Sequence, residues 1–101
     1  MNDDYKRVHI LVSGVVQGVF FRAYTRKVAA EYKLTGWVRN LSDGRVEIMA
    51  EGKEGMLQKL VEWSKNGSPN AKVQKVQFSW LPYSGEFSEF EIRPTASQPA
   101  S

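Results

Sequence analysis

The sequence predicts an α+β sandwich in which two helices cover one face of an antiparallel sheet. Three observations support this fold class. Apolar residues alternate in several short segments, two other segments have apolar residues at helical spacing, and glycine-containing turns separate these segments. The predicted order is strand, helix, strand, strand, helix, strand, followed by one short strand.

The first half of the chain contains a strand, a helix and a hairpin. Val8, Ile10 and Val12 alternate with less apolar residues and predict a strand that begins at about Val8. Apolar residues at three- and four-residue steps over 21–33 predict a helix of about three turns. Strands over 35–41 and 45–51 flank Ser42-Asp43-Gly44, which predicts a β-hairpin.

The second half of the chain contains one helix and two strands. Residues 53–65 have an apolar stripe that predicts a helix, which Asn66-Gly67 ends. Residues 73–81 predict a fourth strand, and Phe87, Phe90 and Ile92 a short last one. The complete order matches the split βαβ, ferredoxin-like sandwich. Many unrelated activities occur on this fold, so it predicts no function by itself.

Length and composition favour one globular domain over residues 1–101, with flexible ends at 1–6 and 95–101. With 14 Lys+Arg and 11 Asp+Glu, the net charge of +3 is too mild to indicate nucleic acid. There is no cysteine for a disulfide, a thiolate metal site or a cysteine nucleophile. No apolar stretch approaches the ~20 residues that span a bilayer, and no signal peptide opens the chain. We therefore expect a cytoplasmic protein, and the charged residues without an obvious large apolar patch favour a monomer.

The segment with the clearest chemical pattern lies between the first strand and the first helix. Gly14 and Gly18 allow backbone angles at which successive N–H groups point to one place, forming an anion-binding nest. The nest leads into a helix N-terminus, which also favours an anion. Arg22 lies in the first turn, where a cation is unfavourable for the helix dipole, and its guanidinium can hold two phosphate oxygens. The spacing fits equally a plain glycine-rich connection followed by a solvent-facing arginine.

A second candidate is Asn40, in the segment Gly36-Trp37-Val38-Arg39-Asn40 that ends the second strand. In the predicted topology the third strand pairs with both the first and the second, which brings Asn40 near the glycine-rich loop. Its amide offers a donor and an acceptor. Capping of the hairpin turn by its own backbone is the alternative role of this asparagine.

Together the two segments resemble the acylphosphatase family. Val12-x-Gly14-x-Val16-Gln17-Gly18-Val19-x-Phe21-Arg22 is similar to its first signature, and Gly36-Trp37-Val38-Arg39-Asn40-x-x-x-Gly44-x-Val46 with Gly52 is similar to its second. Both are long and have fixed spacing, and the resemblance covers roughly residues 6–93.

The resemblance implies an enzyme that hydrolyses the carboxyl–phosphate bond of acyl phosphates without a metal or other cofactor. It implies that Arg22 binds the phosphoryl oxygens and that Asn40 orients the attacking water. The backbone of Val16, Gln17, Gly18, Val19, Phe20 and Phe21 would complete the phosphate site. The implied partners are a small acyl phosphate and, as competitive ligands, inorganic phosphate or sulfate; neither nucleic acid nor a membrane is implied.

Other polar residues have simpler interpretations. His9 is the only histidine and is expected to be a satisfied or exposed strand residue. Glu47 and Glu51 lie on the polar side of a strand, where we expect a solvated face. One histidine without cysteine gives no metal-ligand cluster. RNA binding on an aromatic sheet face, and a phosphate-binding domain without turnover, are the competing function classes, and the aromatic motif of RNA-binding sheets is missing.

Overall fold

The computed structural model describes residues 4–100 and contains every predicted helix and strand. The strands are β1 (Tyr5–Val15), β2 (Thr35–Asn40), β3 (Val46–Lys53), β4 (Lys72–Pro82) and β5 (Phe90–Ile92). The helices are α1 (Phe21–Glu31) and α2 (Glu54–Ser64).

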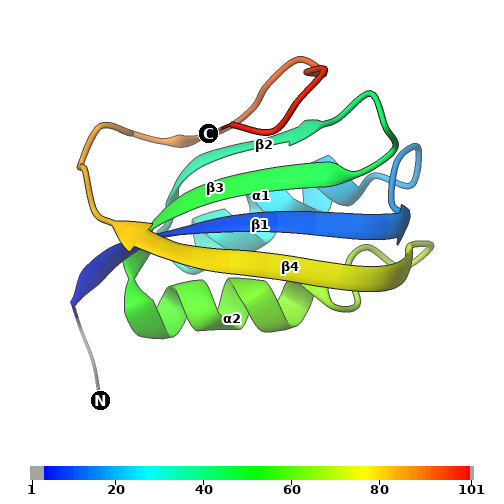
Figure 1. Cartoon of the computed structure of the whole chain (residues 1–101). Coiled ribbons are helices and arrows are strands. Elements are labelled where there is room, and N and C mark those ends of the chain that lie inside the picture. The colour runs from blue at the N-terminus through cyan, green and yellow to red at the C-terminus, as the bar shows by residue number, and fades with distance from the viewer. Residues whose placement is uncertain (1–3, 101) are drawn as a thin grey trace.

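The five strands form one sheet in the order β4-β1-β3-β2-β5. β1 pairs antiparallel with β3 and β4, and β2 pairs antiparallel with β3. β5 pairs parallel with β2, so the sheet is mixed and not antiparallel throughout. Both helices lie on one side of the sheet, α1 against β2 and β5 and α2 against β1 and β3 (Figure 1). The structure thus confirms the α+β, ferredoxin-like sandwich.

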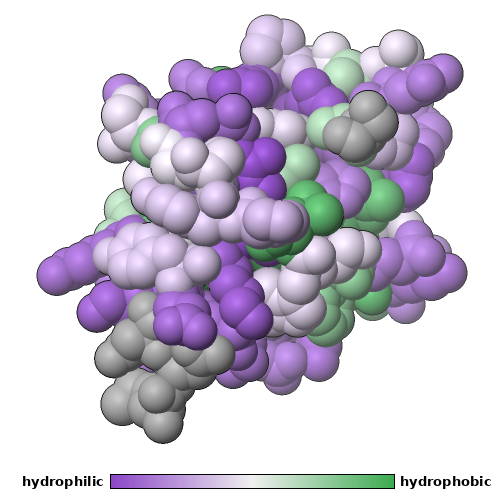
Figure 2. All heavy atoms as spheres, turned by 60° about the vertical axis from the view of Figure 1, so that its left-hand side comes forward, coloured by the Kyte–Doolittle hydropathy of each residue, from purple (hydrophilic) through white to green (hydrophobic). Residues whose placement is uncertain are grey.

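The core lies between the sheet and the helices. Strand residues that alternate along the chain are fully buried there, as their spacing predicts: Val8, Ile10, Val12, Val38, Val46, Ile48 and Ala50. Burying each large apolar side chain stabilises the fold by roughly 1.5–3 kcal/mol. The ring of Phe21 on α1 packs against Trp63 on α2, with 5.3 Å between ring centroids. Polar and charged residues cover much of the surface seen in Figure 2, and hydrophobic residues extend from its middle toward the lower right.

β1 is longer than predicted at both ends. Tyr5 and Lys6 pair with β3, and Lys6 also pairs with Pro82 of β4, so strand pairing on both sides extends a segment whose side chains do not alternate. At the other end Gly14 lies inside the strand. Its φ is +127°, and a Cβ there would lie 2.2 Å from the carbonyl oxygen of Lys72, so the glycine permits close approach of β4.

Parts of the two end segments, 1–6 and 95–101, form backbone contacts in the structure, and their flexibility stays a prediction. Tyr5 and Lys6 belong to β1, while residues 1–3 and 101 lie outside the described part of the chain. Ala96 forms a bridge with Leu41, and the Ala100 amide donates to the Glu47 carboxylate at 2.8 Å. The small polar residues of this segment carry no periodic signal, so its backbone contacts leave no trace in the sequence.

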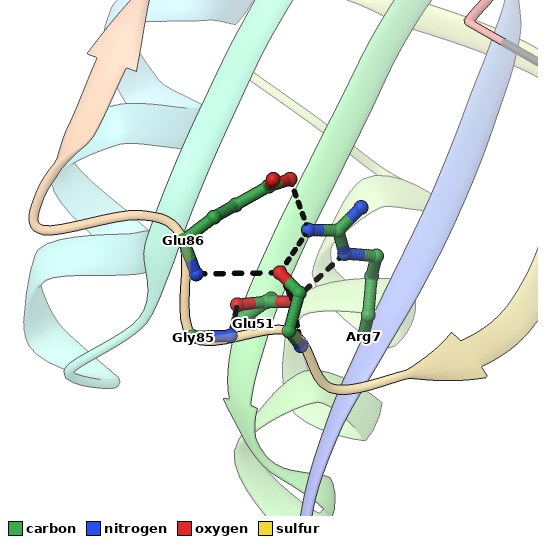
Figure 3. Close-up of polar contacts among 5 residues, drawn as sticks. Arg7, Glu51, Gly85 and Glu86 are labelled. Atoms are coloured by element: carbon green, nitrogen blue, oxygen red, sulfur yellow. Dashed lines mark hydrogen bonds and ion pairs between the residues drawn. The ribbon is translucent and has the colours of Figure 1, made fainter.

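The expectation that Glu47 and Glu51 form a solvated face is wrong, because both are buried at 0% and 1% relative exposure. They lie on the face of β3 opposite the helices, where residues 84–86 and 100 approach them. Glu51 accepts hydrogen bonds from the Ser84 amide at 2.8 Å, the Gly85 amide at 3.1 Å and Arg7 Nε at 2.8 Å (Figure 3). A buried carboxylate needs such partners.

The surroundings of Glu51 make the stability of the fold depend on pH. Burial alone would raise the pKa of Glu51, but the Ser84 hydrogen bonds and Arg7 outweigh it and hold the pKa below the ordinary value of 4.5. Because the pKa of Glu51 is lower in the folded state than in the unfolded chain, the ionised Glu51 carboxylate stabilises the fold above about pH 4.5. This contribution is lost as the pH falls through the pKa of Glu51 in the folded state.

Glu51→Ala is therefore expected to lower the free energy of unfolding by about 3–5 kcal/mol at neutral pH, because it leaves the Nε–H of Arg7 and the amides of Ser84 and Gly85 without their acceptor. Urea denaturation of both proteins measures the difference, which should shrink in acid. Glu62→Ala is the control, since within residues 4–100 the Glu62 carboxylate forms only an exposed pair with Lys65 and should change stability by less than about 1 kcal/mol. Equal stability of Glu51→Ala and the wild type would contradict this role.

Candidate active site

The loop over residues 16–20 connects β1 to α1 and is held from two sides. Gln17 Nε2 donates to the carbonyl oxygens of Leu41, at 2.7 Å, and Arg45, at 2.9 Å, in the β2–β3 connection. Ser68 Oγ donates to the carbonyl oxygen of Val19 at 2.7 Å. These bonds fix the loop between the hairpin and the segment after α2, so its amides are preorganised before any ligand binds.

Two residues of the loop have left-handed backbone angles. Gly18 has φ +75° with open space around the position of a Cβ, so the angle and not the space calls for glycine there. Phe20 has φ +62° and ψ +22°, although it is not glycine, and 75% of its surface is exposed. Such a conformation costs of order 1–3 kcal/mol and clusters at functional sites. The Phe20 carbonyl accepts the Tyr24 amide at 3.1 Å, a hydrogen bond of the first turn of α1.

The amides of residues 17–21 donate no hydrogen bond to any residue between 4 and 100. The first turn of α1 has no acidic residue, and the α1 N-cap makes no side-chain hydrogen bond. The unpaired amides and the helix dipole together favour an anion at this end of the helix.

Arg22 is half-buried in the first turn of α1, and no acidic side chain in the described part of the chain pairs with it. Four other arginines, Arg7, Arg39, Arg45 and Arg93, each pair with a carboxylate, and within residues 4–100 only the exposed Arg26 shares the lack of an acidic partner. A cation without a partner beside unpaired amides can bind two oxygens of a phosphate.

Arg22 and the loop border a hollow of about 290 Å³. Its lining combines the arginine with apolar side chains and glycine: Val16, Gly18, Phe20, Phe21, Arg22, Ala23 and Ile92. Four of the six predicted loop residues thus face one hollow together with Arg22. Gln17 instead anchors the loop to the hairpin, and Val19 packs against the core.

Asn40 is the last residue of β2 and is half-buried. Its Oδ1 atom is buried, and it is the only buried side-chain oxygen or nitrogen without a hydrogen-bond partner among residues 4–100. Asn40 does not line the hollow itself, but the next residue, Leu41, holds the Gln17 side chain of the loop. A hydrogen bond therefore links the 16–20 loop, the candidate phosphate loop, to the residue that follows Asn40.

Comparison with known proteins identifies the family. The model of the acylphosphatase family matches residues 8–92. The chain belongs to the acylphosphatase family. It is 51% identical over 86 residues to the acylphosphatase of Pelotomaculum thermopropionicum, covering 85% of this chain and 94% of that protein. Solved acylphosphatase structures from Coxiella burnetii and Bacillus subtilis both superpose with a TM-score of 0.84, at 43% and 44% identity, and cover 89% and 87% of this chain and 94% and 98% of theirs.

Family membership confirms the resemblance of the two motifs and makes this chain a hydrolase of the acylphosphatase family. The structure adds residues that the motifs alone do not single out. Ser68 anchors the loop, and Ile92 and Ala23 line the hollow of this acylphosphatase. No pattern near Ser68 or Ile92 links either residue to the loop, because both come from distant parts of the chain.

The other polar candidates of this acylphosphatase are structural. His9 Nε2 contacts Glu47 Oε2 at 2.6 Å, and Arg39 Nε donates to Glu47 Oε1 at 2.7 Å, so His9 is a satisfied strand residue as predicted.

Residues 4–100 contain no group of three or more potential metal ligands among His, Cys, Asp and Glu. No helix in that range is long and apolar enough to cross a membrane.

Proposed function

We propose that this chain hydrolyses acyl phosphates to a carboxylate and inorganic phosphate, without a metal ion. The observation that carries the proposal is the Arg22 guanidinium, which has no acidic partner within residues 4–100, beside the unpaired amides of residues 17–21. Both would bind the phosphoryl oxygens and stabilise the charge on them in the transition state. A single preorganised donor contributes ~10²–10³ in rate, so several are ample for a bond that is already labile.

In the proposed reaction the oxygen of water attacks phosphorus while the bond from phosphorus to the carboxyl oxygen breaks. The carboxylate departs with the electron pair and, being a good leaving group, needs no general acid. The buried, unpaired Oδ1 of Asn40 supports a role in accepting a hydrogen bond from the attacking water. A neutral amide is no base, so the water proton passes to a phosphate oxygen of the substrate.

The acyl group would lie against the apolar part of the hollow. Phe20 and Ile92 are exposed at 75% and 38% and border the hollow with Ala23. These side chains offer contact area but no polar group that would select one acyl group over another. We therefore propose a broad class of acyl phosphates as substrates.

Release of phosphate from benzoyl phosphate by the purified chain tests the proposal. We expect turnover that EDTA leaves unchanged, and competitive inhibition by inorganic phosphate and sulfate. A domain that binds phosphate without turnover would show the competition in a binding assay but no release. Loss of activity with EDTA that added Mg²⁺ restores would contradict the metal-independent reaction.

We also propose that the protein is a monomer of the cytoplasm. The mainly hydrophilic surface of the face in Figure 2 and the absence of cysteine support these two proposals. Sedimentation velocity tests the monomer directly.

A further inference from the structure

We propose that residues 93–100, here called the strap, position Asn40 for its role with the attacking water. This inference rests on the function proposed above. The family match ends at residue 92, so the strap lies outside the part of the chain that the family model matches. It is a positioning element and supplies no group to the reaction itself.

The strap continues the edge of β2 where β5 stops. The pairing of β5 with β2 ends at Ile92 and Val38, two residues before Asn40. From there the Arg93 amide donates to the Val38 carbonyl at 2.9 Å, and the Ala96 amide donates to the Asn40 carbonyl at 3.1 Å. Without the strap Asn40 would still pair with Val46 of β3, but its carbonyl would have no partner on the outer edge of β2, and a strand end held on one side only is less firmly fixed.

The hairpin next to Asn40 is held by the same residue of the strap. The Ser42 amide donates to the Ala96 carbonyl at 2.9 Å, and Ala96 forms a parallel bridge with Leu41. Ala96 therefore fixes the backbone on both sides of Leu41. Gln17 binds the Leu41 carbonyl from the loop, so the Asn40–Leu41 backbone lies between the strap and the phosphate loop.

The far end of the strap is anchored to a buried group. The Ala100 amide donates to Glu47 Oε2 at 2.8 Å, and Glu47 is fully buried between His9 and Arg39. Glu47 lies opposite Arg39 in the pairing of β2 with β3, one residue before Asn40. The strap, whose last part runs beside β2 in Figure 1, is thus tied down at both ends of its course.

This arrangement matters because Asn40 Oδ1 acts by position alone. A misplacement of about 1 Å can cost a positioning group on the order of 10²-fold in rate. No hydrogen bond within residues 4–100 joins the strap to Arg22 or to the loop amides, and the strap reaches the loop only through Leu41, whose carbonyl Gln17 also shares with Arg45 as an anchor. Loosening the strap should therefore lower kcat much more than it changes the affinity for inorganic phosphate.

Ala96→Pro tests the proposal, since it removes the N–H that donates to Asn40. We expect kcat for benzoyl phosphate to fall roughly tenfold, with KM and the inhibition constant of phosphate within about twofold of the wild type. Gln98→Pro is the matched control, because Gln98 is exposed and its amide donates to no residue between 4 and 100. It should keep the wild-type kcat.

A role through Asn40 requires that Ala96→Pro has no further effect in the Asn40→Ala background. An equal drop in that background, or a normal kcat of Ala96→Pro alone, would overturn the inference. If circular dichroism finds Ala96→Pro unfolded, Ala100→Pro, which frees only the far end, must lower kcat for the proposal to stand. The proposed function itself fails on different results: a wild-type chain that releases no phosphate, or an Asn40→Ala variant with normal turnover.

Discussion

Arg22→Ala is expected to lower kcat/KM for benzoyl phosphate by about 10³-fold and to weaken inhibition by inorganic phosphate at the same time. The guanidinium would contact the phosphoryl group in the substrate, the transition state and the product, so both binding and rate depend on it. Charge-assisted hydrogen bonds of this kind are worth about 1.5–3 kcal/mol each, and arginine can form two at once. Steady-state kinetics with phosphate as inhibitor measure both effects.

Two further variants separate the charge of Arg22 from its shape. Arg22→Lys keeps the charge but loses the planar fork, and we expect it to recover only part of the lost rate. Arg26→Ala is the control, because Arg26 is exposed one turn further along α1 and lies outside the hollow. Unchanged inhibition by phosphate in Arg22→Ala would mean that the anion binds elsewhere.

Short-range patterns account for most of the fold. The alternation of Val8, Ile10 and Val12 and the helical spacing over 21–33 each report a buried face, and burial decides both elements. The pattern fails for Glu47 and Glu51. Alternation places them correctly on the face away from the helices, but only the return of residues 84–100 over that face decides that they are buried.

In the candidate site, too, some residues can be predicted from the local sequence and others only from the structure. Gly18 and Arg22 are local signals, since the glycine permits the loop and the arginine follows it directly. The role of Gln17 was out of reach of the sequence, because its acceptors are the carbonyls of Leu41 and Arg45, 24 and 28 residues away. A side chain that binds distant backbone leaves no pattern in its neighbours, which also explains why Ser68 and Ala96 are found only in the structure.

Asn40→Ala is expected to lower kcat by about 10²–10³-fold while the inhibition constant of inorganic phosphate stays near the wild-type value. The reason is that Asn40 would act on the water and not on the phosphate. Because Oδ1 is buried without a partner, its removal also relieves an unsatisfied polar atom, and the folded state should lose little or no stability. Kinetics and urea denaturation of the same preparation check the two halves of this prediction.

Asn40→Asp makes the test sharper, because the carboxylate keeps an acceptor of almost the same shape but adds a negative charge. Because the added carboxylate repels the phosphate anion, we expect Asn40→Asp to bind inorganic phosphate more weakly than Asn40→Ala does. Asn70→Ala, a change of an exposed asparagine far along the chain, should behave as the wild type. A loss of phosphate affinity in Asn40→Ala equal to its loss of rate would place Asn40 on the phosphate and remove it from the water.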